Sequence, residues 1–325
     1  MKHEHMMRDQ PLAVARSAAR ADAAARPAVA APPPRSLWSD AWRQFRRRHL
    51  AVAGLGLLGL IVLATLLGPL VYTTPHNRVD FGVASQGPSW QHPFGTNDLG
   101  QDVLARALYG GRISVAVGVV AMLVTIALGT LVGALAGFFG GLVDALLMRT
   151  TDVFLALPQL PLLLLIIFLF REPITRLLGP EAGIFALVVL IIGGLNWMAL
   201  ARVVRASFLS LREAEFVQAA HALGVQPRWI IARHILPNTL GPVIVAASLA
   251  VGAAIITESS LSFLGLGFPP DTPTWGRMLF EAQNFIEFTP TMALFPGLCI
   301  VLTVLSVNAI GDGLHDAFDP QLRGR

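Results

Sequence analysis

The sequence has 325 residues, of which 54% are hydrophobic and 14% charged, and its mean hydropathy is +0.63. A soluble globular domain carries about 25% charged residues, so this composition excludes an ordinary soluble domain and favours a membrane protein. The net charge of +4 comes from arginines that cluster at the ends of apolar runs, which indicates membrane orientation rather than nucleic-acid binding.

The N-terminal part of the chain precedes any apolar run. Residues 1–35 are rich in Ala, Arg and Pro, and we expect a disordered cytoplasmic tail there. Residues 36–49 form a basic pre-membrane segment around Arg46. No short apolar stretch with a cleavage site lies near the start, so the run from Leu50 is predicted to be a retained span rather than a signal peptide.

Six apolar runs, each of roughly 20 residues, predict an all-α membrane protein with six transmembrane helices. The first span and its outer link occupy 50–112, a core of five spans occupies 113–312, and a C-terminal tail occupies 313–325. The predicted spans are 50–72, 113–138, 146–170, 184–201, 239–259 and 291–310.

Arginines are distributed unevenly among the links between these spans. The segment before the first span, the link at 202–238 and the C-terminal tail are rich in arginine, whereas 73–112 and 260–290 have few arginines for their length. Arginine-rich links stay on the cytoplasmic side of a membrane. We therefore predict that both termini and 202–238 are cytoplasmic.

The outer link at 73–112 is predicted to contain a short amphipathic helix at the membrane surface. Thr96 is the predicted N-cap, an apolar stripe runs from Leu99 to Leu108, and Gly110 is the predicted end. This helix would precede the second span.

The second span carries glycines at four-residue spacing. Gly129, Gly133 and Gly137 share one helix face, with Gly141 one step further. Small residues at this spacing let another helix backbone approach closely, so these three glycines are predicted helix-packing residues.

The third span contains two prolines, Pro158 and Pro161, which predict a kink. The kink is either part of a gate in a transport pathway or a fixed bend that packing requires. At the start of this span, Asp144, Arg149 and Asp152 are predicted to form a charge cluster at the membrane interface.

Glu258 lies near the outer end of the fifth span. An ionisable group at membrane depth is a candidate pathway residue. The alternative is that Glu258 reaches the interface or bonds to Ser259 or Ser260.

Several motifs for catalysis and ligand binding are absent or lack their context. "GLGLLG" at 54–59 lies within an apolar run without a preceding strand, so it is not a dinucleotide site. Lys2 is the only lysine, which excludes a P-loop for ATP, and there is no nucleophile elbow. The single cysteine, Cys299, and the N-terminal histidines indicate no metal site. The sequence therefore predicts no enzyme active site and no metal or cofactor of its own.

The link at 213–238 has the pattern of two short helices. Phe216, Ala219, Ala220 and Leu223 follow the i, i+3, i+4, i+7 spacing that places them on one helix face. Gly224 is suited to end this helix, and Pro227 can begin a second one.

This link resembles the EAA loop of permease subunits in bacterial ATP-binding-cassette importers. Ala219, Ala220, Gly224 and Leu236–Pro237 match the loop pattern, and Gln218 stands at the position of its glutamate. In that family the loop is a coupling helix that docks into a groove of the ATPase subunit. The resemblance implies ATPase-coupling roles for Glu215, Phe216, Ala219, Ala220, Leu223, Gly224 and Pro237.

Three further segments resemble the C-type permease of the dipeptide, oligopeptide and nickel importer group. They are "HPFGTNDLGQDVLARALYGGRIS", with Asn97 and Gln101 in place of the usual Asp and Arg, "LSFLGLGFPPDTPTWGRML", and "NAIGDGLHDAFDP". The resemblance implies a permease in the bacterial inner membrane that imports di- and oligopeptides. The implied partners are a second permease, two ATPase subunits that hold ATP and magnesium, and a periplasmic or lipid-anchored substrate-binding protein.

Two other functions are open at this point. The chain could be an independent secondary transporter or channel, which predicts paired broken helices in inverted repeats, and no convincing repeat is found. Within the importer group, the cargo could be nickel, glutathione or another small solute instead of peptides.

The predicted orientation can be tested with an impermeant thiol reagent on intact cells. We expect a thiol introduced by Gln226→Cys to be unreactive from outside, and one in 73–112 to react, because the arginine-rich links are cytoplasmic. External labelling of Gln226→Cys would contradict the topology.

Overall fold

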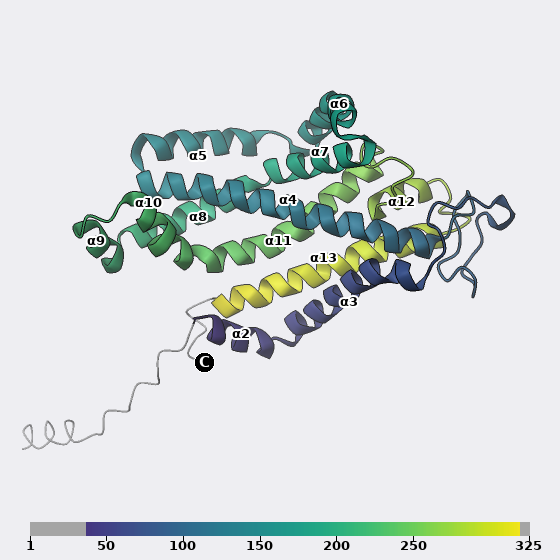
Figure 1. Ribbon diagram of the computed structural model, residues 1–325, viewed down its shortest axis with the longest axis horizontal. Coiled ribbons are helices and arrows are strands. Elements are labelled where there is room, and N and C mark those ends of the chain that lie inside the picture. Colours follow the sequence, from purple (N-terminus) through teal and green to yellow (C-terminus); the bar gives the residue numbers. More distant parts are fainter. Residues whose placement is uncertain (1–36, 319–325) are drawn as a thin grey trace, which may run out of the picture. The chain divides into compact units, whose positions relative to one another are not determined.

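The computed structural model describes residues 37–318, and every regular element in that range is helical (Figure 1). Among the described residues, those from Ala41 to Phe318 belong to one compact unit. The tail predicted at 1–35 and the last residues of the tail predicted at 313–325 lie outside the described residues. The elements are α2 (Leu37–Arg47), α3 (His49–Val71), η1 (Phe81–Val83), α4 (Val103–Phe139), α5 (Gly141–Ala156), α6 (Gln159–Leu178), α7 (Pro180–Gly194), α8 (Trp197–Arg212), α9 (Glu215–Ala222), α10 (Pro227–Trp229), η2 (Ile230–Ile235), α11 (Leu236–Phe263), α12 (Trp275–Ala282) and α13 (Thr291–Phe318).

Four helical runs are long and apolar enough to cross a membrane alone: α3, α4, the continuous run from α10 to α11, and α13. Two helix pairs qualify only together, α5 with α6 and α7 with α8, and they bend by 90° and 42° at their breaks. Counting each bent pair as one span gives six, which agrees with the predicted number.

The long helix α4 packs against α3, α5, α7, α8 and α11, while α13 packs between α3 and α11 (Figure 1). Where α4, α6, α7 and α11 meet, an apolar core forms in which Val117, Leu163, Ile192 and Leu261 are fully buried. This core holds both bent pairs against the two straight spans.

The separate amphipathic helix predicted before the second span is not present. The helix α4 begins at Val103 and continues without a break to Phe139, and its N-cap is Asp102, which accepts a hydrogen bond from the Ala105 amide at 2.7 Å. The predicted cap, Thr96, instead accepts a hydrogen bond from the Gln86 amide at 2.9 Å in the outer link. Gly110 does not end a helix, because α4 continues through it. The glycine is needed there for a different reason: a Cβ at this position would collide with the Pro273 carbonyl.

The predicted glycine stripe of α4 packs against α8, as the spacing indicates. A Cβ at Gly129 would lie 2.9 Å from Leu200, and one at Gly137 would lie 2.5 Å from the Cβ of Phe208. Gly141 does not extend the stripe, because α4 ends at Phe139, and a Cβ at Gly141 would meet nothing within 4 Å. The three glycines therefore set the close approach of α4 and α8.

A proline near the end of α3 explains a contact between α3 and α4. Pro69 has no N–H, so the carbonyl of Thr65, four residues earlier, has no intrahelical donor. The guanidinium of Arg112 supplies hydrogen bonds, from Nε to the Thr65 carbonyl at 2.8 Å and from a terminal nitrogen to the Leu66 carbonyl at 2.6 Å. This interaction ties the C-terminal end of α3 to α4.

The α4–α8 contact predicts the effect of Gly133→Ala. The new Cβ would lie 2.5 Å from the Ala201 carbonyl oxygen and 2.7 Å from Val204 Cβ, so we expect a loss of stability of about 1–3 kcal/mol. The measurement is the thermal unfolding midpoint of the purified protein. Gly56→Ala is the matched control, because a Cβ there meets nothing within 4 Å and alanine favours the helix. Equal midpoints for the two variants would contradict the packing role.

Candidate functional site

The link at 213–238 forms the short helix that its sequence predicts. After α9, Gly224 has φ +75° and donates to the His221 carbonyl at 2.9 Å, and Val225 donates to the Ala220 carbonyl at 3.1 Å. These two bonds form a Schellman motif, which ends a helix at a left-handed residue. Pro227 then begins α10, as predicted.

The structure corrects which residues of α9 share a face. Ala220 is 5% exposed and Val217 is fully buried, and both pack into an apolar cluster with Phe208 of α8. Ala219 is exposed, and so are Phe216 at 45% and Leu223 at 83%. Ala220 therefore belongs to the protein's own core. The predicted face is wide, and its Ala220 side meets the core while its Phe216 and Leu223 side is exposed.

A π-helical turn, η2, joins α10 to α11. Its hydrogen bond from the Leu236 amide to the Ile231 carbonyl spans five residues, and Ile230 and Ile235 are both fully buried. Pro237 follows in the first turn of α11. The turn thus anchors α9 and α10 to the body of the protein through two isoleucines.

Two ion pairs join α5 to α8. Asp144 accepts two hydrogen bonds from Arg205, at 2.5 and 2.6 Å, and Asp152 pairs with Arg202 at 2.6 Å. The sequence predicted a cluster of Asp144, Arg149 and Asp152, but among the described residues no ion pair includes Arg149. Each aspartate pairs instead with an arginine from the following bent pair.

The predicted kink at Pro158 and Pro161 is a complete break with a 90° bend. Pro158 is the N-cap of α6 and Pro161 lies in its first turn, where a backbone N–H has no intrahelical partner. The prolines therefore begin a new helix rather than bend an existing one.

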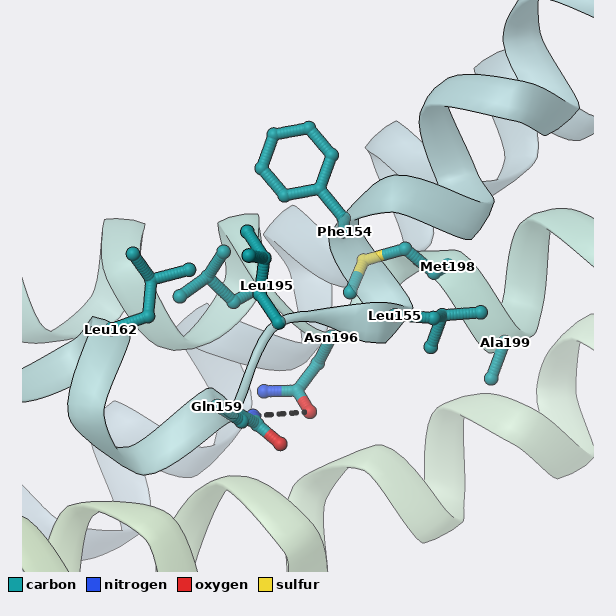
Figure 2. Close-up of a pocket in the computed structure, with 9 residues that line it drawn as sticks. Phe154, Leu155, Gln159, Leu162, Leu195, Asn196, Met198 and Ala199 are labelled. Atoms are coloured by element: carbon teal, nitrogen blue, oxygen red, sulfur yellow. Dashed lines mark hydrogen bonds between the residues drawn. The ribbon is translucent and has the colours of Figure 1, made fainter.

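A cavity lies between the two helix breaks (Figure 2). Most of the residues that line it are apolar, with Phe154, Leu162 and Met198 among them. Two amide side chains also line it, and Gln159 Nε2 donates to Asn196 Oδ1 at 3.2 Å. Asn196 in turn donates to the Ile192 carbonyl at 2.6 Å. Sequence analysis missed Gln159 and Asn196, although each is an uncharged polar residue within an apolar run.

Glu258 is fully buried, so its carboxyl group does not reach the surface of this chain. Ser262 donates to its carboxyl group at 2.8 Å, and Ser114 of α4 lies 3.5 Å away. The same Ser114 oxygen accepts from the Trp275 amide at 3.2 Å. Glu258 therefore joins α4, α11 and α12, and within the described residues no salt bridge includes it.

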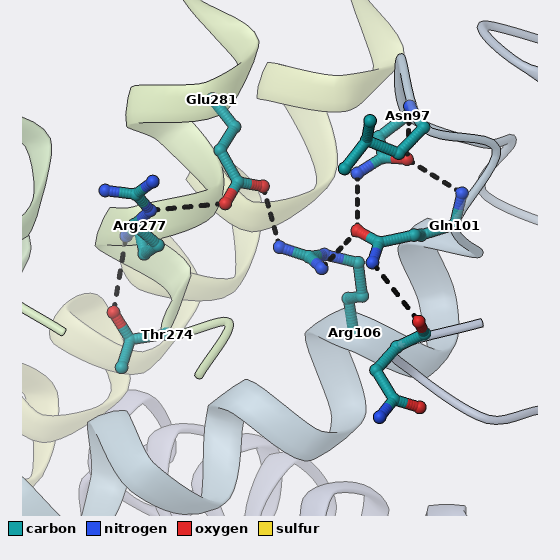
Figure 3. Close-up of polar contacts among 8 residues, drawn as sticks. Asn97, Gln101, Arg106, Thr274, Arg277 and Glu281 are labelled. Atoms are coloured by element: carbon teal, nitrogen blue, oxygen red, sulfur yellow. Dashed lines mark hydrogen bonds and ion pairs between the residues drawn. The ribbon is translucent and has the colours of Figure 1, made fainter. Parts of the chain in front are cut away.

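A polar network links the start of α4 to α12 (Figure 3). Arg106 lies 2.7 Å from the Glu281 carboxylate, which also pairs with Arg277 at 3.2 Å. On its other side Arg106 donates to Gln101, which is hydrogen-bonded by Asn97 at 2.8 Å. Of the two replacements noted, Gln101 is thus a direct partner of a nearly buried arginine, and Asn97 is a partner of Gln101.

Asp102 holds the outer link to the ends of two spans. Its carboxylate lies 2.7 Å from the Tyr72 hydroxyl and 2.7 Å from His92 Nδ1, while it caps α4. Burial and the hydrogen bond to Asp102 raise the pKa of Tyr72 to about 12. Tyr72 therefore stays a neutral donor throughout the physiological range.

The chain is similar to known proteins over most of its length. The family described as binding-protein-dependent transport system inner membrane component matches residues 129–324, and the N-terminal TM domain of oligopeptide transport permease C matches 36–88. A dipeptide transport system permease of Alkalihalophilus pseudofirmus is 38% identical over 288 residues, covering 89% of this chain and 91% of the relative. An oligopeptide transport system permease of Haemophilus influenzae is 40% identical over 291 residues (89% and 90%). A glutathione transport system permease of Pectobacterium atrosepticum is 38% identical over 290 residues (89% and 93%).

The end of α9 predicts different effects for two substitutions of Gly224. A Cβ there meets nothing within 4 Å, so a substitution acts through the backbone, whose φ is +75°. We expect Gly224→Val to cost about 1–3 kcal/mol and Gly224→Asn distinctly less, because asparagine adopts this conformation more readily. Hydrogen exchange of the α9 amides should be faster in the valine variant. Equal exchange rates in both variants would contradict the role of a left-handed Gly224 in ending α9.

Proposed function

The chain belongs to the family of binding-protein-dependent transport system inner membrane components, and on that premise we propose that it imports di- and oligopeptides across the bacterial inner membrane. Membership makes it a multi-pass, non-catalytic permease subunit of an ATP-driven importer in the peptide and glutathione group. An independent secondary transporter or channel is thereby set aside.

The peptide cargo is the more specific part of the proposal. Two of the relatives above are named for dipeptide and oligopeptide transport, and a third for glutathione, which is itself a small peptide. The cargo supported by these relatives together is a short chain of amino acids. Nickel, which the sequence resemblance left open, has no such support among these three relatives.

The observation that carries the coupling mechanism is the exposed apolar face of α9. Phe216 and Leu223 are 45% and 83% exposed, with Ala219 between them, although Val217 holds the same helix firmly to the core. A rigidly mounted helix with exposed apolar side chains is suited to docking into a groove of a partner. We propose that this partner is an ATPase subunit, which holds ATP and magnesium.

Movement of the ATPase would reach the spans by a short route. The helix α9 follows α8 directly, and α10 leads through the π-helical turn η2 into α11. A displacement of α9 is therefore transmitted to one bent pair and one straight span at once. Closure of the ATPase subunits would in this way change the arrangement of α8 and α11.

The remaining partners and the orientation follow from the same proposal. The permease works with a second permease, two ATPase subunits and a periplasmic or lipid-anchored substrate-binding protein. The termini and α9 face the cytoplasm, and the outer link that ends at Asp102 faces the periplasm. The arginine-rich link at 202–238, which contains α9, supports this orientation.

The coupling role predicts that Ala219→Arg releases the ATPase. A long charged side chain on the docking face would be buried without a partner, at a cost of about 3–5 kcal/mol. The variant should fold and insert, because Ala219 is exposed, but lose ATPase subunits on purification and lose peptide uptake.

Two controls accompany this variant. Gln218→Arg adds the same side chain at an exposed position that lies about 200° around the helix from Phe216. Complexes with this variant should retain the ATPase. Ala220→Arg should instead destabilise the permease itself, because Ala220 is 5% exposed within the core. If Ala219→Arg complexes keep their ATPase subunits and transport normally, α9 is not the coupling helix.

The proposed cargo predicts a specific competition in uptake experiments. Cells that depend on this permease should take up a labelled dipeptide, and unlabelled di- and tripeptides should compete, because the pathway accepts short peptides. Competition by glutathione alone, or by nickel alone, would contradict the peptide assignment in favour of that solute.

A further inference from the structure

Three polar pairs follow one another along α5 and α8, from the ends nearer α9 to the cavity between the helix breaks. In order from the start of α5, Asp144 pairs with Arg205, Asp152 with Arg202, and Gln159 with Asn196. Each pair joins the α5–α6 span to α8 or to the residue just before it. We call the four residues of the two pairs nearer the cavity, Asp152, Arg202, Gln159 and Asn196, the polar seam.

The amide pair of the polar seam lies far along the two spans, whereas Asp152 and Arg202 lie closer to the ends near α9. The helices α5 and α8 each have 16 residues, so each break lies about 24 Å along its span from the end nearer α9. The hydrocarbon layer of a bilayer is about 30 Å thick. Both breaks therefore lie at matching distances along their spans, and those distances are shorter than the thickness of this layer.

Lipid is an unsuitable neighbour for these side chains. Asp152 and Arg202 are 53% and 52% exposed in this chain, and their ion pair has no third partner among the described residues. Near the end of a span as well, charged side chains face the bundle interior or water rather than lipid tails. The middle of α6 differs, because Leu165 and Phe168 are exposed at 53% and 75% and suit an apolar environment.

We propose that the polar seam is the wall that this chain contributes to the cargo path, where it takes the charged ends and backbone amides of peptide cargo. This inference rests on the proposed function. Asp152 can receive an ammonium group, and the planar guanidinium of Arg202 can bind a carboxylate through two hydrogen bonds. An exposed ion pair contributes little stability, so the two side chains can exchange each other for the cargo's ends at small cost.

The amide pair serves the middle of the cargo. Gln159 Oε1 has no hydrogen bond to any described residue, and Nε2 makes only the 3.2 Å bond to Asn196. An amide side chain both donates and accepts, so it can bond to the N–H and C=O groups that every peptide carries. Apolar neighbours such as Phe154 and Leu162 allow contact with side chains of different kinds. The seam thus fits the features that short peptides share.

The first test asks whether water reaches the seam. Cys299 is the only cysteine, so Cys299→Ala gives a background for single introduced thiols. In the assembled complex in proteoliposomes, a charged methanethiosulfonate reagent should modify Gln159→Cys about tenfold faster than Leu63→Cys, because the reagent requires a hydrated thiolate. Leu63 is 55% exposed in the middle of α3 and is the lipid-facing control. An alanyl dipeptide should slow the reaction at Gln159→Cys only. Equal rates at the two positions would overturn the proposal.

The second test asks whether the charges contact cargo. The double variant Asp152→Asn with Arg202→Gln should raise the apparent KM for an alanyl dipeptide about tenfold, because two charge-assisted contacts are lost. It should leave ATPase co-purification unchanged. The control is Glu172→Gln with Arg176→Gln, an exposed ion pair at the far end of α6, which should not change KM. An unchanged KM in the seam variant would overturn the cargo contact.

The two levels of inference fail in different ways. If the unmodified complex does not import the dipeptide, the proposed cargo is wrong, and the labelling rates still report whether the seam is hydrated. If the unmodified complex imports the dipeptide but Gln159→Cys reacts no faster than Leu63→Cys, the seam does not line the path while the importer assignment stands.

Discussion

The close approach of α4 and α8 sets the positions of the parts that carry the proposed function. Three glycines of α4 leave room for Leu200, Val204 and Phe208 of α8, and a side chain at any of them would push the helices apart. The helix α8 leads directly into α9, and α4 leads directly into α5. One glycine-lined contact therefore fixes both the exposed helix and the two walls of the polar seam.

Breaks in helices, rather than the helices themselves, produce the features that a transport pathway requires. The break at Pro158 costs few hydrogen bonds, because Pro158 and Pro161 have no N–H and could not donate in an intact helix either. It does turn the chain by 90° and brings Gln159 beside Asn196. Non-helical backbone at membrane depth is tolerated where it is covered by protein or lines a cavity. The cavity between the two breaks meets this condition.

Where the start of α4 meets α12, buried polar groups add to an apolar cluster that includes Val103 and Met278. Arg106 is nearly buried between Glu281 and Gln101, and Glu258 is fully buried among serine hydroxyls. Each such group is costly without its partners, so the loops that supply the partners are held in one arrangement. The short helix α12 is thereby fixed against α4, where the Trp275 side chain donates to the Ala107 carbonyl at 3.0 Å.

The sequence by itself determined the features that depend on neighbours along the chain. Apolar run lengths gave the six spans, four-residue spacing gave the glycine face, and Gly224 with Pro227 gave the end of α9 and the start of α10. Tertiary structure alone decided that Ala220 faces the core while Ala219 faces outward, and that Arg202 pairs with Asp152. It also decided that Arg106 meets Glu281, 175 residues away. The physical reason is that helical periodicity fixes which residues share a face, whereas the packing of distant helices decides what that face meets.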